Sequence, residues 1–252
     1  MNAWRYSVLL TLSLLAWGCS NKQAVTLKGA EEYLAEGQKA LEKKRYPEAI
    51  EKLQRVVTNY PGASVVGDAQ FLLAEAHFRS KEYVNAVFEY QRLLDSYPSS
   101  KWAEEAQYKI GEAYFQQRRR PELDQKETLD AINQFRRFLD DSPDSPLAEQ
   151  ARQRIATCRG QLARKLYLGA QLYYRQDRFE AAAQVYREVV RGYPDTPWYY
   201  EALAQLGEIA SRNKDLTQAR AYWQEVLQDG KDEELAKQVR KRMTELERQP
   251  GG

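Results

Sequence analysis

An alanine recurs at the same point of a helical pattern five times along this chain, and in four cases a proline follows it twelve residues later. The pairs are Ala49 with Pro61, Ala86 with Pro98, Ala131 with Pro143 and Ala182 with Pro194, and the fifth alanine is Ala219. Proline lacks an amide hydrogen and disfavours helix for the residue before it, so each helix is predicted to end just ahead of its proline. A fixed register of this kind indicates a repeat array, in which each unit packs on its neighbours. The function is therefore expected in a binding surface and not in a catalytic pocket.

Each alanine lies in the second helix of a predicted helix pair, and a first helix precedes it. The first helices are predicted at residues 33–43, 68–79, 102–116, 164–175 and 201–212. Small residues recur where two helices must approach closely, at Gly37, Ala74, Gly111, Ala170 and Gly207. With the alanine and the closing proline, these positions resemble the tetratricopeptide repeat, a helix-turn-helix unit of about 34 residues.

Two irregular steps interrupt the array. The step between successive alanines is 37 residues at both ends of the array, but 45 residues before Ala131 and 51 residues after it. The first insertion, residues 117–127, is polar and contains a proline, which predicts a loop inside the third pair. The second, residues 147–175, has no proline, which predicts one fused helix of about 28 residues, roughly 40 Å long at 1.5 Å per residue.

The predicted fold is all-α, a tetratricopeptide-like superhelix of about five helix pairs with one long central helix. The predicted organisation runs from a lipoprotein signal peptide (1–18) and an anchor linker (19–29) to an N-terminal tetratricopeptide block of repeats one to three (30–146), then a long helix with a C-terminal block of repeats four and five (147–247), and a flexible tail (248–252).

The beginning of the chain has the pattern of a lipoprotein signal. An apolar run over residues 7–17 is too short to span a membrane permanently, and Gly18 precedes Cys19. The stretch resembles the lipobox of bacterial lipoproteins, although Trp17 departs from the small residue usual there. The resemblance implies a covalent lipid on Cys19, and Ser20 after it implies the outer membrane of Gram-negative cells. The alternative is an ordinary signal peptide with an incidental cysteine.

Charge and motif content argue against nucleic-acid binding and catalysis. Lys plus Arg number 38 against 36 Asp plus Glu, so the basic excess typical of nucleic-acid binders is missing. The single histidine, His77, falls at a position where the repeat pattern expects a core aromatic residue, and Cys158 is expected to be a buried, inert thiol. Phosphate-binding loops and paired metal-ligand motifs are missing from the sequence. We therefore predict no catalytic residues, no metal site and no cofactor beyond the lipid on Cys19.

Aromatic residues recur along the first helices. In tetratricopeptide arrays these helices line a concave groove, and the resemblance places two positions per repeat, seven residues apart, on its wall. They are Leu34 and Leu41, Phe71 and Phe78, Tyr108 and Phe115, Tyr167 and Tyr174, and Ala204 and Ser211. The six aromatic residues among them form the candidate peptide-binding groove, which Arg79, Gln116 and Arg175 would edge. Rigid rings suit an extended peptide with apolar or aromatic residues. The alternative, that the rings pack against the neighbouring repeat, is left open by the register.

The order of elements resembles the BamD, or ComL, family of outer-membrane assembly lipoproteins. The resemblance rests on Cys19, the helix pairs, the stretch 124–131 that leads into residues 135–138, and the long middle helix. It implies a non-enzymatic subunit of the β-barrel assembly machinery on the periplasmic face of the outer membrane. The N-terminal repeats would receive unfolded outer-membrane proteins, and the C-terminal repeats would dock the periplasmic domains of the central barrel subunit, with accessory assembly lipoproteins as further partners.

Two other functions are weighed against this one. A periplasmic tetratricopeptide scaffold, pilotin-like or Tol-Pal-associated, would coordinate envelope machinery without handling substrates. An enzyme whose active site lies in the loop at residues 117–127 has no set of residues to support it.

Overall fold

The structure is a computed structural model that describes residues 29–230 and 232–248, and these residues contain eleven α-helices. In chain order they are α1 (Ala30–Glu42), α2 (Tyr46–Asn59), α3 (Val66–Arg79), α4 (Tyr83–Ser96), α5 (Ala103–Gln116), α6 (Lys126–Asp141), α7 (Ala148–Arg175), α8 (Phe179–Gly192), α9 (Pro197–Arg212), α10 (Leu216–Asp229) and α11 (Glu233–Glu247). The predicted signal peptide, the lipidation site Cys19, nearly all of the anchor linker and nearly all of the tail lie outside the described residues.

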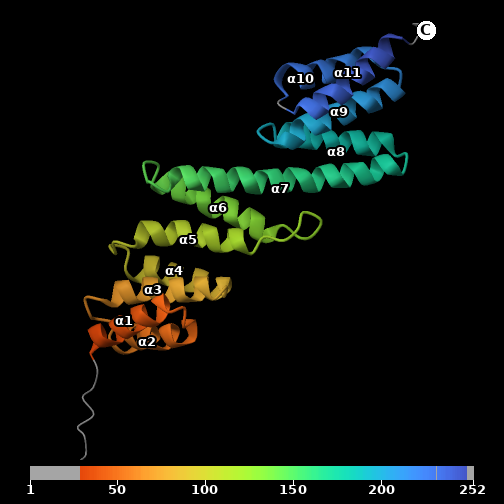
Figure 1. The fold of residues 1–252 in the computed structure, drawn as a ribbon. Coiled ribbons are helices and arrows are strands. Elements are labelled where there is room, and N and C mark those ends of the chain that lie inside the picture. Colours follow the sequence, from red (N-terminus) through yellow and green to blue (C-terminus); the bar gives the residue numbers. More distant parts are fainter. Residues whose placement is uncertain (1–28, 231, 249–252) are drawn as a thin grey trace, which may run out of the picture.

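The helices stack pair upon pair along the molecule (Figure 1). The pairs are α1 with α2, α3 with α4, α5 with α6, the C-terminal half of α7 with α8, and α9 with α10, and α11 packs on α10 and α9 at the end of the stack. The predicted all-α, tetratricopeptide-like superhelix of helix pairs is thereby confirmed. Four second helices end where proline predicts, at the C-cap residues Tyr60, Tyr97, Ser142 and Tyr193.

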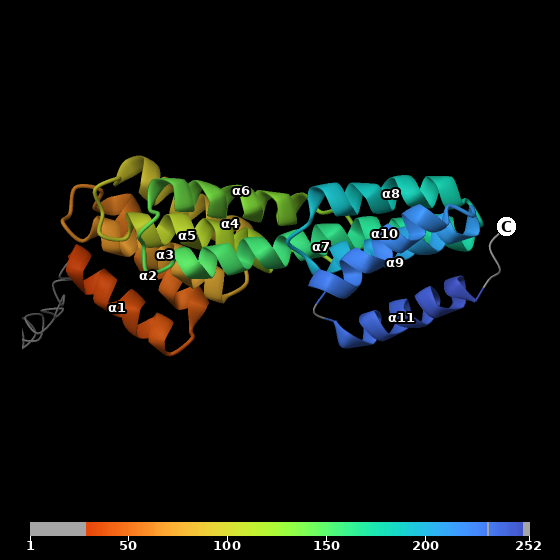
Figure 2. The ribbon, with the colours of Figure 1, turned by 90° about the horizontal axis from the view of Figure 1, so that it is seen from above.

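The long central helix is confirmed as well. Helix α7 has 28 residues and runs through the middle of the molecule, with the pairs that precede it at one end and the pairs that follow it at the other (Figure 2). Its N-terminal half packs on α6 and its C-terminal half on α8. The predicted polar loop occupies residues 117–125, between α5 and α6.

The hydrophobic core is a chain of five clusters, each of which joins a helix pair to the helix that follows it. The fourth residue after each repeat alanine fills the centre of its cluster: Leu53, Tyr90, Phe135, Tyr186 and Trp223. These side chains pack on the small residues of the first helix. A Cβ atom added to Gly111 would lie 2.8 Å from the ring of Phe135, so only glycine fits there at this helix separation.

Four of the five pairs share one turn. A single residue in each turn adopts the left-handed conformation, at Lys44, Lys81, Asp177 and Lys214. In the first pair the amide of Arg45 donates to the carbonyl of Ala40 at 2.9 Å, the bond that closes a Schellman motif. Glycine usually occupies the left-handed position, so the sequence contains no obvious signal for this turn.

Candidate binding surface

All six predicted groove rings pair with a ring of the second helix in the same repeat, and the first ring of each repeat, at Phe71, Tyr108 and Tyr167, is the more buried one. The centroid distances are 5.8 Å for Phe71 with Tyr90, 5.5 Å for Tyr108 with Phe135 and 5.4 Å for Tyr167 with Tyr186. These three first-helix rings are only 4%, 6% and 5% exposed. Their position in the register is the predicted one, but they belong to the core of their repeat.

Residues at the start of the next first helix cover two of these rings. Trp102 stacks on Phe71 at a centroid distance of 4.4 Å and an interplanar angle of 6°, and Trp198 lies 5.1 Å from Tyr167. Both tryptophans come 31 residues after the ring that they cover. The packing alternative therefore describes Phe71, Tyr108 and Tyr167, which present almost no surface to a ligand.

Basic side chains cover the second set of predicted rings, seven residues further along each helix. Lys109 Nζ lies 5.1 Å from the centroid of Phe78, and Arg212 Cζ lies 5.5 Å from that of Tyr174. Phe115 is 7% exposed and is covered by Arg154, whose Cζ lies 4.3 Å from its centroid. Phe78 and Tyr174 are half-buried. Cationic groups therefore lie over the rings of Phe78, Phe115 and Tyr174, in contacts of the cation–π type.

Most of the remaining predicted wall positions are also buried. Leu34, Leu41 and Ala204 are buried, and Ser211 is half-buried. The three predicted edge residues differ from one another: Arg79 pairs with Glu75, Gln116 donates to Glu112 at 2.8 Å, and Arg175 is exposed.

Two buried carboxylates complete this surface. Glu75 accepts from Lys109 Nζ at 2.7 Å, from Arg79 at 3.0 Å and from the hydroxyl of Tyr90. Burial alone would raise the pKa of the Glu75 carboxyl, but Lys109, Tyr90 and Arg79 together outweigh burial and hold the pKa below its usual value.

Glu112 occupies the same register position one repeat later, and its two oxygens accept from Arg154 at 2.8 Å and 3.1 Å. Neither glutamate is part of the sequence pattern that predicts the groove. The available signal was that each one directly follows the small residue of its first helix, Ala74 or Gly111.

A hydrogen-bond network holds the 117–125 loop on α7. The side chain of Gln125 donates to the carbonyl of Leu123 at 3.0 Å and accepts from Gln161 Nε2 at 2.5 Å. Gln161 Nε2 also donates to the carbonyl of Arg119 at 2.7 Å, and Lys165 Nζ donates to that of Leu123 at 2.7 Å. The loop is therefore fixed at the junction between the third and fourth pairs.

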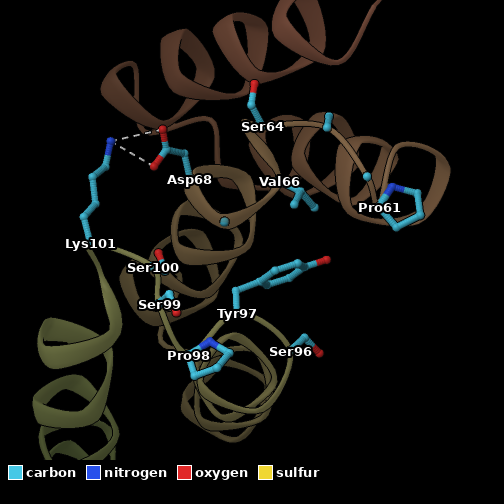
Figure 3. Close-up of a pocket in the computed structure, with 13 residues that line it drawn as sticks. Pro61, Ser64, Val66, Asp68, Ser96, Tyr97, Pro98, Ser99, Ser100 and Lys101 are labelled. Atoms are coloured by element: carbon cyan, nitrogen blue, oxygen red, sulfur yellow. Dashed lines mark hydrogen bonds and ion pairs between the residues drawn. The ribbon is translucent and has the colours of Figure 1, made fainter.

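A cleft of about 630 Å³ lies between the turn after α2 and the turn after α4 (Figure 3). Its lining is rich in serine and small residues, with Pro61, Pro98 and Tyr97 as its larger apolar groups. Its lone carboxylate, Asp68, is engaged by Lys101 Nζ at 3.0 Å and by Trp102 Nε1 at 2.7 Å. The lining residues include neither histidine nor cysteine, so the cleft does not contain a recognisable catalytic set.

The single histidine and the described cysteine occupy structural positions. His77 Nδ1 lies 2.8 Å from Glu82, across the turn of the second pair. Cys158 is buried in the third cluster, and burial raises the pKa of its thiol to about 11, which keeps the thiol protonated at neutral pH. In the part of the chain that the structure describes, there is neither a group of side chains that could hold a metal ion nor a helix long and apolar enough to cross a membrane.

Comparison with known families gives the decisive match. Residues 28–228 match the YfiO family, described as outer membrane lipoproteins. The chain belongs to the YfiO family. Membership makes it an outer membrane lipoprotein of tetratricopeptide-like fold, a fold suited to protein–protein interaction. A comparison with curated proteins found no match.

Solved structures of tetratricopeptide proteins are similar to this YfiO-family chain. The TPR2AB domain of yeast Sti1 in complex with pHSP90 is 15% identical, the match covers 79% of this chain and 76% of that chain, and the TM-score is 0.44. MamA from Desulfovibrio magneticus is 16% identical, with 83% and 96% covered and a TM-score of 0.36. A thermophilic TPR protein of Thermus thermophilus is 16% identical, with 86% and 100% covered and a TM-score of 0.36.

Proposed function

We propose that this YfiO-family protein is a lipid-anchored, non-enzymatic subunit of the outer-membrane β-barrel assembly machinery. In this role it scaffolds the central barrel subunit, together with accessory assembly lipoproteins, and receives unfolded outer-membrane proteins. The observation that carries the proposal is the family match over residues 28–228, and the elongated stack of helix pairs supports it because such stacks offer long binding surfaces.

The anchor in this proposal is a covalent lipid on Cys19, and the protein needs no other cofactor. Stable membrane attachment takes at least two hydrophobic or electrostatic signals, and multiple acyl chains on one cysteine supply them. Replacing the cysteine, Cys19→Ala, should move the protein from the outer-membrane fraction to the soluble periplasm. Unchanged fractionation would show that a lipid on Cys19 is not what holds the protein to the outer membrane.

For the substrate surface we propose the half-buried ring Phe78 with Lys109, which lies over it, and the neighbouring Arg79; these two cations share the single carboxylate of Glu75. A peptide that ends in an aromatic residue offers a ring for Phe78 and a terminal carboxylate for the cations. The variant Phe78→Ala should weaken binding of such a peptide while helicity stays intact. A matched control is Leu129→Ala, which alters an exposed side chain (49%) on α6. Equal affinities in the two variants would count against this surface.

Co-purification from mild detergent tests the assignment as a whole. We expect the full-length protein to bring down a large barrel protein that carries periplasmic domains. If that protein is missing and a secretin or a Tol-Pal component is recovered in its place, the scaffold belongs to a different envelope machine and the proposal fails.

A further inference from the structure

Three positions of each interior first helix pack against the preceding helix pair. In α3, α5 and α9 they are occupied by Ala69, Leu73 and Ala76, by Ala106, Ile110 and Ala113, and by Ala202, Leu206 and Ile209. All nine side chains are at most 3% exposed. In a regular array this face of the first helix is therefore always covered by helices.

The C-terminal half of α7 is the first helix of the fourth pair, and there the same face is open. The register follows from Tyr167, which matches Phe71 because each pairs with a second-helix ring and lies under a tryptophan. The three corresponding positions are Lys165, Gly169 and Leu172. The preceding pair packs on the N-terminal half of α7 instead, because the fused helix displaces it along the helix axis.

Exposure at these positions agrees with an uncovered face. Leu172 is 52% exposed, and a Cβ atom added to Gly169 would meet nothing within 4 Å. The 117–125 loop reaches only the first position, where Lys165 Nζ donates to the carbonyl of Leu123. The two remaining positions, Gly169 and Leu172, leave about one helical turn accessible on a face that is elsewhere covered.

The surroundings of this face are positively charged. Helix α7 contains a single carboxylate, Glu149, in its first turn, against five arginines and one lysine spaced along its length. Arg164 and Arg175 both lie along one side of the open face, where the guanidinium of Arg164 is 5.8 Å from the ring centroid of Trp198, and Arg119 lies in the loop beside the face. Among the residues that the structure describes, none of these three arginines has a carboxylate partner within ion-pair distance.

We propose that the open face of α7 binds an amphipathic helix of a partner protein. Helices cover the same face in three other repeats of this chain, and Gly169 permits close approach of a backbone, so the shape fits a helix better than an extended strand. The partner helix presents small and apolar residues to Gly169 and Leu172, and carboxylates along one side to the arginines. The inference rests on the proposed function only in requiring that the protein works in an assembly.

A photo-cross-linking amino acid in place of Leu172 tests this proposal in the full-length protein in its native membrane. The matched control carries the same probe in place of Leu129, which is 49% exposed on α6. We expect a cross-linked product at 172, in at least fivefold greater yield than at 129, whose partner peptide maps to a helix with an apolar seam flanked by Asp or Glu. Adding Arg175→Glu should lower the yield at 172 roughly fivefold, the equivalent of about 1 kcal/mol.

Several results would overturn the inference: a product with lipid, a product with a second copy of this chain, a partner segment without flanking carboxylates, equal yields at the two positions, or no product. Co-purification of the large barrel protein is measured in the same preparations. If it persists while the cross-link at 172 fails, the proposed function stands and only the helix-binding face is rejected. Helicity measured by circular dichroism confirms that both probe-bearing proteins are folded.

Discussion

Contacts between a small residue of one helix and a large side chain of its partner set the helix separation in each pair. Gly111 faces Phe135, and Gly207 faces Trp223, whose indole Nε1 donates to the carbonyl of Ala204 at 3.1 Å. The interior is packed nearly as densely as an organic crystal, so an added methyl group must displace a ring. Sequence spacing predicted both glycines as close-approach positions, because the requirement is local to one helix pair.

Exchanging glycine for alanine tests this packing. Gly111→Ala should lower the free energy of unfolding by about 1–3 kcal/mol, because its Cβ would meet the ring of Phe135. Gly160→Ala, in α7, is the control: its Cβ would meet nothing within 4 Å, so the better helix propensity of alanine should raise stability by up to about 1 kcal/mol. Urea unfolding followed by circular dichroism measures both. Changes of the same sign would contradict the close-packing account.

The depressed pKa of Glu75 makes a prediction about acid stability. A carboxyl whose pKa is lower in the folded than in the unfolded state stabilises the fold above its unfolded pKa, near 4.5, and this contribution is lost as pH falls through the folded value. Glu75→Gln should therefore be less stable than the wild type at pH 7, and the difference should shrink as pH falls below about 4.5. Unfolding free energies measured from pH 7 to pH 3 check this. A difference independent of pH would show that Glu75 acts through packing alone.

Among the elements, helix ends were predictable where proline sets them, and the 117–125 loop was predictable from its polar, proline-bearing composition. Its attachment to α7 was not, because the bond between Gln125 and Gln161 joins residues 36 positions apart. The turns at Lys44 and its counterparts also carried no signal, since a residue other than glycine adopts the left-handed conformation there. Local chemistry thus determines where these elements end, whereas distant partners determine how they are held.

Cutting the bond between loop and helix should release the loop. Gln161→Ala removes the donor to Gln125 and to the carbonyl of Arg119, so trypsin should cleave after Arg119 several times faster than in the wild type. Gln153→Ala is the matched control, because this glutamine donates only to Glu149 on its own helix. Limited proteolysis with mass spectrometry of the fragments provides the measurement. Equal cleavage rates in the two variants would mean that the network does not restrain the loop.

At the scale of the whole molecule, the exposure of the candidate groove rings depends on contacts between repeats, which the pattern of a single helix does not contain. The rings at Phe71 and Tyr167 were placed correctly on their helices, but whether they face a ligand depends on Trp102 and Trp198 in the following repeat. The exposure of the open face of α7 likewise depends on the neighbouring repeat, here because none of the described helices covers it. A doubled helix shifts the preceding pair, and residues that are buried in a regular array become accessible. The irregular step after Ala131 predicted the long helix. The exposure of Leu172 could not be predicted from that step, because it depends on how the neighbouring helices pack.

Because α7 belongs to two successive core clusters, it should couple the stability of the two ends of the molecule. Gly160→Pro breaks the helix near the junction of the clusters, two residues before Leu162 of the third cluster, since proline removes a backbone hydrogen bond and clashes with the preceding turn at a cost of about 3 kcal/mol. We expect calorimetry to resolve two unfolding transitions in this variant, one for each end, whereas the wild type and Gly160→Ala unfold in one. The ion pair of Arg159 with Asp195, at 2.7 Å, is a second link near the break. If Gly160→Pro keeps a single transition in which the calorimetric and van't Hoff enthalpies agree, contacts such as this pair, and not the continuous helix, transmit the coupling.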